Sequence, residues 1–338
     1  MSESGNTKPG HPQTGHTRTG MVQRLRMQGV SETTLGLILM ALAMALLPIG
    51  DTFAKHLTGS LHPVEVTFAR LTAQGMFLVP AAILLRKRLR GSMFSPVVAL
   101  SGGLVMVTLT SLIWAFSVMP IATAIAIFFV EPLILTALVG PLLGERVGPR
   151  RLAAVGVGLL GALVVIRPGG GFGAAALLPL LGACAYALNM IVLRRASRDR
   201  SAITVQCGAT FYACLGMGAV LGLMTWSGAI LPAFDTLPAS DWAAVLAAGF
   251  FAAASFVLIA EAFRRAEAGL LAPFQYLEII GATAAGYLVF GDFPDLWTWV
   301  GIAIILASGL YVFRRERLPA NRPGIAPGRR RSRRLRPR

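Results

Sequence analysis

Two carboxylates lie at matching depths in two long apolar stretches of the chain. Glu131 lies ten residues into the stretch 121–144, and Glu278 lies ten residues into the stretch 268–291. Each stretch is about long enough to cross a bilayer as one helix. At about 1.5 Å per residue, both carboxylates are then roughly 15 Å deep, near the midplane. An ionisable group at that depth costs about 2.5–3.5 kcal/mol on insertion scales, which favours a functional role.

The chemistry expected of Glu131 and Glu278 is binding of a coupling proton or of a cationic group of a substrate. The alternative is a carboxylate neutralised by a partner or hydrogen-bonded to a helix break near Pro132. The residue after the carboxylate differs between the two stretches, Pro132 in one and Ile279 in the other. Because proline removes a backbone donor and loosens a helix, we expect the Glu131 site to be the more irregular of the two.

A second group of charged residues is expected near one end of the first two apolar runs. Asp51 and Arg70 lie at similar depth in neighbouring runs, and Lys55 lies one helical turn from Asp51. An Asp51–Arg70 pair either fixes helix packing or contacts a substrate or coupling ion, and the sequence leaves both interpretations open. Glu261, one turn from Arg264 and Arg265, is expected to form an interfacial ion pair.

Five further polar or aromatic side chains lie at useful depths within apolar runs. Each is a candidate for binding, with packing or an interhelical hydrogen bond as the alternative. They are Trp114, Tyr186, Asn189, Gln275 and Tyr276.

The apolar runs that must position these residues define the class of protein. The chain has 338 residues, 55% of them hydrophobic and 14% charged, with a mean hydropathy of +0.68. Soluble domains are rarely so apolar. The runs are about 20 residues long and do not alternate, which favours membrane-spanning helices over a β-barrel.

The fold class expected is an all-α polytopic membrane protein with ten transmembrane helices. Residues 1–30 carry no apolar run and are expected to be a disordered tail rather than a signal peptide. The helix boundaries carry an error of two to four residues. The helices are expected at 35–57, 64–85, 97–118, 121–143, 152–166, 174–193, 205–226, 242–263, 269–290 and 296–313.

The basic residues predict the orientation. With the amino terminus inside, 28 of the 31 lysines and arginines fall in cytoplasmic segments, and the outer loops hold only Arg167. Lys55 and Arg70 lie within helices. This asymmetry predicts that both termini are cytoplasmic. The net charge of +16 is therefore explained by membrane anchoring, with 11 basic residues in the tail from Arg314 onward, and not by nucleic acid.

Several absences exclude other classes of protein. The three cysteines show no CxxC spacing, and the four histidines lie in the amino-terminal tail or near the outer surface, so neither set predicts a metal site. No P-loop, dinucleotide fingerprint, nucleophile elbow or HExxH motif is present. We therefore predict no enzyme, no cofactor and no ATP-driven pump.

The two stretches with carboxylates indicate an internal duplication. The offset of 147 that aligns Glu131 with Glu278 also aligns Gly144-Glu145 with Gly291-Asp292, and an offset of 138 aligns Asp51 with Asn189. Each copy holds five helices, an odd number, so the second copy enters the membrane from the opposite side. Inverted repeats of this kind are typical of secondary transporters, with a substrate site near the midplane between the repeats.

The run 128–169, FFVEPLILTALVGPLLGERVGPRRLAAVGVGLLGALVVIRPG, resembles the end of an EamA-type repeat of the drug/metabolite transporter superfamily. The resemblance covers residues 31 to about 316. It implies two inverted five-helix repeats, 31–168 and 169–316, and alternating-access transport of small metabolites. The second copy departs from the pattern at Ile279 and Asp292. The residues that carry the resemblance are Pro132, Gly144-Glu145, the glycines of the fifth helix and Arg167-Pro168-Gly169.

The sequence as a whole predicts a secondary transporter of the bacterial inner membrane that exports a small metabolite such as an amino acid or a vitamin. Uptake of a vitamin or nucleoside-like metabolite by the same fold is the first alternative, and a membrane-embedded enzyme or a non-transporting sensor is the second. The expected partners are a small-molecule substrate, a proton or other coupling ion and the lipid bilayer, with a homodimer left open. Residues 317–338 are expected to be a basic cytoplasmic tail.

Overall fold

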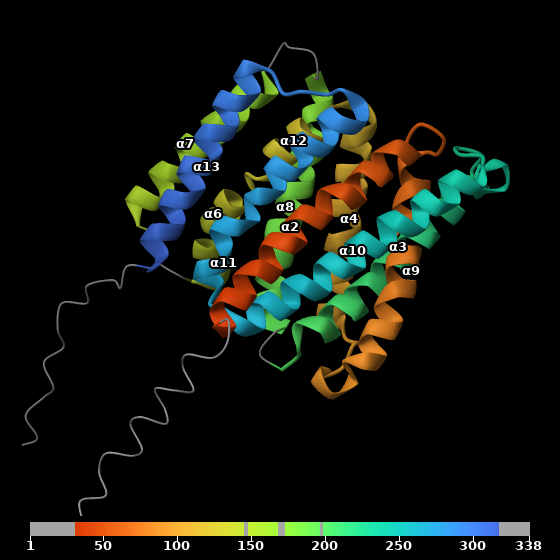
Figure 1. Ribbon diagram of the computed structural model, residues 1–338, viewed down its shortest axis with the longest axis horizontal. Helices are drawn as coiled ribbons and strands as arrows, with labels where there is room; N and C mark the ends of the chain where they lie inside the picture. Colours follow the sequence, from red (N-terminus) through yellow and green to blue (C-terminus); the bar gives the residue numbers. More distant parts are fainter. Residues whose placement is uncertain (1–30, 145–147, 168–172, 197–198, 318–338) are drawn as a thin grey trace, which may run out of the picture.

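The computed structural model describes residues 31–144, 148–167, 173–196 and 199–317, and this part of the chain is helical without strands (Figure 1). Three short 3₁₀ segments, η1 (Arg86–Arg88), η2 (Gly173–Ala176) and η3 (Phe234–Thr236), accompany the α-helices. The α-helices are α2 (Glu32–Leu57), α3 (Pro63–Leu84), α4 (Pro96–Val118), α5 (Ile121–Phe128), α6 (Glu131–Leu143), α7 (Pro149–Ile166), α8 (Leu177–Ala196), α9 (Ala202–Trp226), α10 (Ala239–Arg265), α11 (Ala268–Gln275), α12 (Leu277–Phe290) and α13 (Leu296–Arg317).

The helix ends follow local signals in the sequence. Ser31 and Ser201 each accept a hydrogen bond from the backbone N–H three residues on, which caps α2 and α9. Pro96 starts α4, where a missing N–H costs nothing. Gly144 and Gly291 end α6 and α12 with φ of 71° and 72°, a left-handed conformation that favours glycine.

The observed helices confirm an all-α polytopic membrane protein. Every outer boundary of the ten expected helices lies within four residues of an observed helix end. Within the described residues, nine helical segments are long and apolar enough to cross a membrane, with 121–142 counted as one segment. Helices α11 and α12, at 268–290, are not among these nine segments.

Two of the expected helices are not continuous, and here the prediction was wrong. The expected helix 121–143 is divided at Phe129 and Val130, and the expected helix 269–290 is divided at Tyr276. The sequence reading placed irregularity mainly in the first copy because of Pro132. The second copy is broken as well, although Ile279 follows its carboxylate.

The contacts of the first five helical segments recur in the second five. Helix α2 packs on α10 and α12, just as α8 packs on α4 and α6. Helices α7 and α13 pack on each other, as do α3 and α9, the two members of each pair holding the same place in their copies. Each helix thus packs on the counterparts of the helices that its own counterpart contacts, which fits a two-fold relation between the two halves of the chain. The repeat boundaries at 31–168 and 169–316 stay a prediction.

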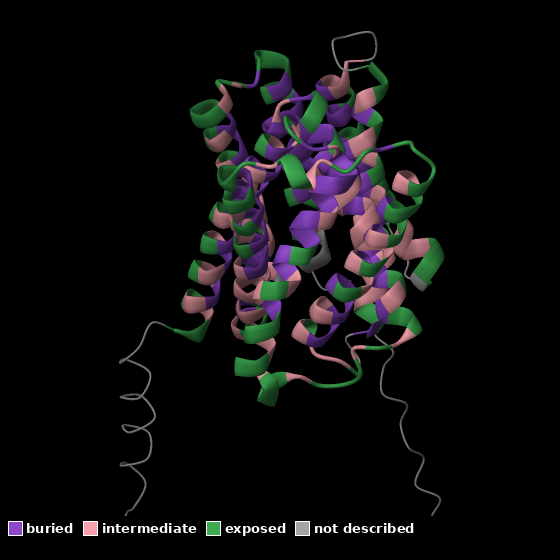
Figure 2. Cartoon of the chain, turned by 90° about the vertical axis from the view of Figure 1, so that its right-hand side faces the viewer, coloured by how far each residue is buried: buried purple, intermediate pink, exposed green. Residues whose placement is uncertain are grey.

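The core is densest at one end of the bundle. We call the end that holds Arg88, Arg194 and Arg264 the arginine-rich end. The largest cluster of buried apolar residues, from Leu57 and Leu61 to Phe116 and Ile121, lies toward the opposite end. Figure 2 shows this buried material inside the bundle. The helices are therefore closely packed at the end away from the arginines.

Some sequence predictions fall on parts of the chain that the structure does not describe. These are the two tails, 1–30 and 318–338, and the family-like residues Glu145, Pro168 and Gly169. They lie outside the described residues, so the tail predictions stay as they were. The last described residues of α13 extend four positions past the expected end, to Arg317.

Candidate functional site

The two helix breaks meet in the middle of the bundle. Phe129 caps the end of α5, Tyr276 caps the end of α11, and their ring centroids are 5.3 Å apart. Glu131 is the first residue of α6 and Glu278 is the second residue of α12. Both carboxylates thus begin a half-helix, where the free backbone N–H groups and the helix dipole favour negative charge.

The breaks have local causes on either side of the carboxylates. Pro132 follows Glu131 and cannot donate the backbone hydrogen bond that would continue α5 into α6. In the second copy the proline precedes the break, because Pro273 lies within α11. The offset of 147 aligns Pro273 with Ala126, so each copy has a proline on a different side of its break.

Glu131 lies among aromatic side chains. Its Oε1 is buried and has no hydrogen-bond partner among the described residues. Glu131 interacts electrostatically with Tyr186 and Tyr276, and the Tyr186 ring lies 5.6 Å from that of Phe128. An orphaned carboxylate oxygen in an apolar setting is costly unless something else meets it, so it marks a place for a proton, a water or a ligand group.

Glu278 lies beside a buried ion pair. Asp51 Oδ1 accepts from Arg70 Nη1 at 2.8 Å, and both side chains are at most 10% exposed. The charges of this pair act on Glu278, and Glu278 also acts on Tyr186. The structure therefore brings together six of the residues singled out in the sequence: Asp51, Arg70, Glu131, Tyr186, Tyr276 and Glu278.

Lys55 lies one turn beyond this group, and its proposed role in binding stays a prediction. Its Nζ forms an ion pair with Asp292 at 2.6 Å and lies 4.7 Å from the centroid of the Phe290 ring. Lys55 meets Asp292 because one further turn of α2 beyond Asp51 carries it to the level where α12 ends. The pair joins the first and second halves of the chain at the end opposite the arginines.

Two other candidates also lie apart from the helix breaks. Trp114 lies near the end of α4, 40% exposed, with its ring 5.5 Å from His62. Asn189 is buried in α8, and its Oδ1 accepts from Ser101 Oγ at 2.6 Å. Asn189 thus makes the interhelical hydrogen bond that was its alternative interpretation.

A cavity of about 500 Å³ joins the breaks to the arginine-rich end. Pro132, Gln275 and Tyr276 line its deep part, and Arg151 and Arg194 line the part near the arginines. A solute entering from the arginine-rich end would therefore reach the two half-helices. The dense packing at the opposite end leaves this as the open side of the bundle in the structure.

Gly309 in α13 is a functional candidate that the sequence analysis missed. A Cβ at this position would overlap the hydroxyl of Tyr276, so only glycine lets the tyrosine rest against α13. Gly309 and Tyr276 both line the cavity. Phe128, Phe129 and Asp292 were also missed. The aromatic pair Phe128-Phe129, separated from Glu131 by Val130, was the available signal for two of them.

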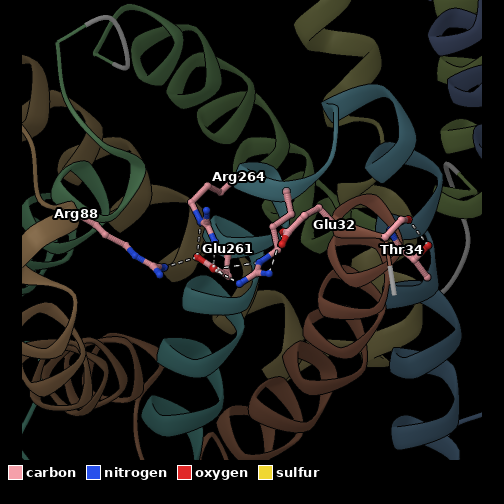
Figure 3. A network of polar contacts seen from close by, with 7 residues as sticks. Glu32, Thr34, Arg88, Glu261 and Arg264 are labelled. Carbon is pink, nitrogen blue, oxygen red and sulfur yellow. Dashed lines mark hydrogen bonds and ion pairs between the residues drawn. The ribbon is translucent and has the colours of Figure 1, made fainter. Parts of the chain in front are cut away.

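The arginine-rich end is held by a network around Glu261 (Figure 3). Glu261 accepts from Arg88, Arg264 and Arg265 at 2.6–2.7 Å, and Arg265 also pairs with Glu32. The network joins η1, the end of α10 and the start of α2. The ion-pair prediction for Glu261 is confirmed, and its exposed partners place it at the surface of the bundle rather than in the cavity.

Comparison with known proteins gives a family match over both halves of the chain. A sequence model described as the EamA-like transporter family matches residues 34–167 and, a second time, residues 173–314. A solved crystal structure is similar with a TM-score of 0.57 and 20% sequence identity, covering 85% of this chain and 98% of its own. At 20% sequence identity, this similarity supports a shared fold and nothing about function.

Curated relatives are transporters by name. A riboflavin transporter of Rhizobium johnstonii is 32% identical over 206 residues, which cover 60% of this chain and 66% of that protein. An S-adenosylmethionine uptake transporter of Rickettsia prowazekii is 26% identical, covering 83% of this chain and 93% of that protein. A pseudopaline exporter of Pseudomonas aeruginosa is 24% identical, covering 83% of this chain and 97% of that protein.

Proposed function

Because this chain belongs to the EamA-like transporter family, we propose that it is a secondary transporter that moves a small metabolite by alternating access through the site between its two helix breaks. One observation carries the proposal: two half-helices, each with a carboxylate in its first turn, start at breaks whose residues Pro132 and Tyr276 line a cavity. Broken helices at the interface of two halves are how secondary transporters form substrate and ion sites.

The chemistry of the site suggests the class of solute. Glu131 has an oxygen without a partner among the described residues and interacts with two tyrosines, whose rings pack against two phenylalanines close to it in sequence. The four rings are those of Phe128, Phe129, Tyr186 and Tyr276. Such a site fits a vitamin, amino acid or related solute that carries a flat ring together with a cationic or hydrogen-bond-donating group. Relatives named for riboflavin and for S-adenosylmethionine support this class.

The solute is tested with purified protein. We expect a thermal-shift screen against metabolites to show stabilisation by aromatic or cationic metabolites, with riboflavin and S-adenosylmethionine as the first two compounds. Flux of each stabilising compound is then measured in proteoliposomes with and without a proton gradient. Movement of no solute under any ion gradient would favour the sensor or enzyme alternative and overturn the proposal.

For direction, we retain export as the proposal and uptake as the alternative. The relatives include proteins named for each direction, so their names support both. Proteoliposomes sorted by orientation separate the two cases. A proton gradient is imposed in the physiological direction, and net accumulation of the solute is measured. The result decides whether the solute moves toward or away from the arginine-rich end.

We also propose that the arginine-rich end faces the cytoplasm of a bacterial inner membrane. The loops at this end carry the basic residues that the positive-inside rule places in the cytoplasm. Reporter fusions after residues 60, 90, 170 and 200 should alternate outside, inside, outside and inside. An outside signal at residue 90 would overturn the orientation without affecting the transport proposal.

A further inference from the structure

A second hollow lies on a different face of the bundle, between α3 and α9. We propose that it is a binding site for an anionic phospholipid, which lays one acyl chain in the hollow and places its headgroup phosphate at Arg86. We call this hollow the α3–α9 groove. Its volume is about 650 Å³, and it lies away from the two helix breaks. The proposal does not rest on the transport function.

The walls of the groove are apolar. Helix α3 contributes residues from Leu71 to Ile83, and α9 contributes residues from Cys207 to Cys214. The floor is closed where the helices touch, because Gln74 Nε2 donates to Thr210 Oγ1 at 3.1 Å. The other polar atom of this amide, Gln74 Oε1, is buried without a hydrogen-bond partner among the described residues, but Gln74 does not line the groove itself. The lining is mostly apolar, so a hydrocarbon chain is the occupant that such walls favour.

The direction and length of the groove match one leaflet of a bilayer. From Leu71 to Leu84, α3 rises about 20 Å along its axis. Half of a hydrocarbon core is about 15 Å thick. The groove therefore runs from the arginine-rich surface to about the midplane, as an acyl chain anchored at that surface would.

The segment that follows α3 borders the groove at the arginine-rich end and supplies the charge. Met93 and Phe94 from this segment pack on α9, with the Phe94 ring 5.5 Å from that of Phe211. Among the described residues that line the groove, Arg86 alone is charged. Arg86 is exposed and forms no ion pair with a described residue, whereas nearby Arg88 is engaged by Glu261. A basic residue at the mouth of a cleft between membrane helices is suited to a lipid phosphate.

The charge decides between a lipid and another copy of the chain. In a symmetric contact the same surface of both copies meets, so the groove itself would have to supply a carboxylate to pair with Arg86 of the second copy. The residues that line the groove include no carboxylate. A phospholipid brings the phosphate and the apolar chain together in the required order. A zwitterionic headgroup adds a positive charge next to Arg86, so an anionic lipid should bind better.

The structure provides substitutions that change one feature of the groove at a time. A Cβ at Gly75 would meet only Thr210 Cγ2, at 3.9 Å, so Gly75→Leu fills the groove without disturbing the helix contact. Gly222→Leu is its control, because a Cβ at Gly222 meets nothing within 4 Å and this exposed residue lies outside the groove. Arg86→Gln removes the charge. Lys87→Gln is its control, being exposed and adjacent but outside the groove.

The experiment is native mass spectrometry of the detergent-solubilised full chain with equal amounts of dioleoyl phosphatidylglycerol and dioleoyl phosphatidylcholine. We expect the wild type to retain about fivefold more phosphatidylglycerol than phosphatidylcholine, as one basic residue near the headgroup would give. Arg86→Gln should lose this preference, and Gly75→Leu should lose bound lipid of both kinds. Both controls should match the wild type, and inorganic phosphate should not displace the lipid.

Three results would overturn the assignment. Equal retention of the two lipids by the wild type would remove the role of Arg86. Equal losses in Arg86→Gln and Lys87→Gln would show only a general attraction to the basic surface. A dimer that Gly75→Leu abolishes would assign the groove to a second copy of the chain.

Discussion

The two broken helices carry equivalent carboxylates in different electrostatic surroundings. Glu278, in α12, lies beside the buried Asp51–Arg70 pair, whose charges act on it. Glu131, in α6, interacts with two tyrosines and keeps Oε1 without a partner among the described residues. Duplication placed the same residue type in both copies, and the neighbours on α2 and α3 made the copies unequal.

This difference suggests a division of labour between the carboxylates. Arg70 attracts Glu278 while Asp51 repels it more strongly, so Glu278 has fixed charges of both signs beside it. Glu131 lies among aromatic rings with Oε1 lacking a partner among the described residues, so an arriving cation or proton would be its first compensation. We therefore assign the variable event, binding of a proton or a cationic substrate group, to the Glu131 side, and a more constant structural role to the Glu278 side.

The largest expected effect comes from removing the cation on the Glu278 side. Arg70→Met leaves Asp51 and Glu278 without their shared positive neighbour, and loss of one partner from a buried ion pair costs about 3–5 kcal/mol. Asp51→Asn should cost less, because Arg70 still faces Glu278. The measurement is the free energy of unfolding in mixed detergent for both variants.

The double variant Asp51→Leu/Arg70→Met is the control for this prediction. Replacing both members of a buried pair by apolar side chains is often close to neutral, so it should recover part of the loss. Arg70→Met with wild-type stability, or Asp51→Asn with the larger loss, would contradict the proposed sharing of Arg70 between the two carboxylates.

The second effect concerns transport by the two carboxylates. Glu131→Gln keeps size and hydrogen bonding but cannot ionise, and we expect it to lower flux about 100-fold, as loss of ~3 kcal/mol of interaction with a buried charge would. Glu278→Gln should lower flux less. The measurement is flux against external pH in proteoliposomes for wild type and both variants at matched protein levels.

The pH profile separates charge from shape in this comparison. The wild-type profile should show a pH dependence that Glu131→Gln removes and Glu278→Gln keeps. If both glutamine variants retain wild-type rates and wild-type pH dependence, the carboxylates are structural and the site proposed here is wrong.

The third effect tests how the Glu131 side is shaped. Gly309→Ala should push Tyr276 off α13 into the cavity, because the added Cβ would overlap the tyrosine hydroxyl. We expect KM for the transported solute to rise on the order of tenfold, with a smaller change in the maximal rate. The measurement is the concentration dependence of flux.

Rescue identifies the cause of that change. The overlap falls on the hydroxyl of Tyr276, so Gly309→Ala/Tyr276→Phe should recover most of the wild-type KM. Gly103→Ala in α4 is a matched control, because a Cβ there meets nothing within 4 Å. A double variant as impaired as Gly309→Ala alone would show that the contact does not set the site.

The sequence was sufficient for the parts of this architecture that depend on local pattern. Runs of apolar residues gave the helices, and a carboxylate at mid-depth identified both Glu131 and Glu278 because burial of charge is costly anywhere in a membrane. The second helix break was missed because its proline, Pro273, precedes the break instead of following it. A search for proline on either side of each carboxylate would have found it.

Partnerships between distant residues could not be predicted in this way. Asp51 and Arg70 were paired correctly because a short loop joins their helices. The partner of Lys55 was not predicted because Asp292 is 237 positions away and reaches it only through packing of α2 against α12. Gly309 was missed for the same reason, since its importance comes from a tyrosine on another helix.

The smallest effect concerns an exposed ion pair that serves as the reference for the buried one. Asp295 caps α13, accepts from Thr298 and pairs with Arg167 at the end of α7. The two pairs have the same residue types and differ in burial. The side chains of Asp51 and Arg70 are 10% and 4% exposed, whereas those of Asp295 and Arg167 are 52% and 37% exposed. Solvent screens the second pair, so it should contribute less than about 1 kcal/mol.

The hydrogen bond from Arg167, followed by those from Thr298, lowers the pKa of Asp295 below its usual value. A lowered pKa in the folded state means that the stabilisation is fully present above the unfolded pKa, about 3.9, and is lost as pH falls through the folded value.

Asp295→Asn keeps the cap but not the charge. It should therefore lower the thermal midpoint slightly and equally at pH 7 and pH 5, less at pH 3, and less in high salt. Asp235→Asn, at an exposed residue that forms no ion pair with a described residue, should change nothing. A loss as large as that of Arg70→Met would show that burial does not separate the two pairs.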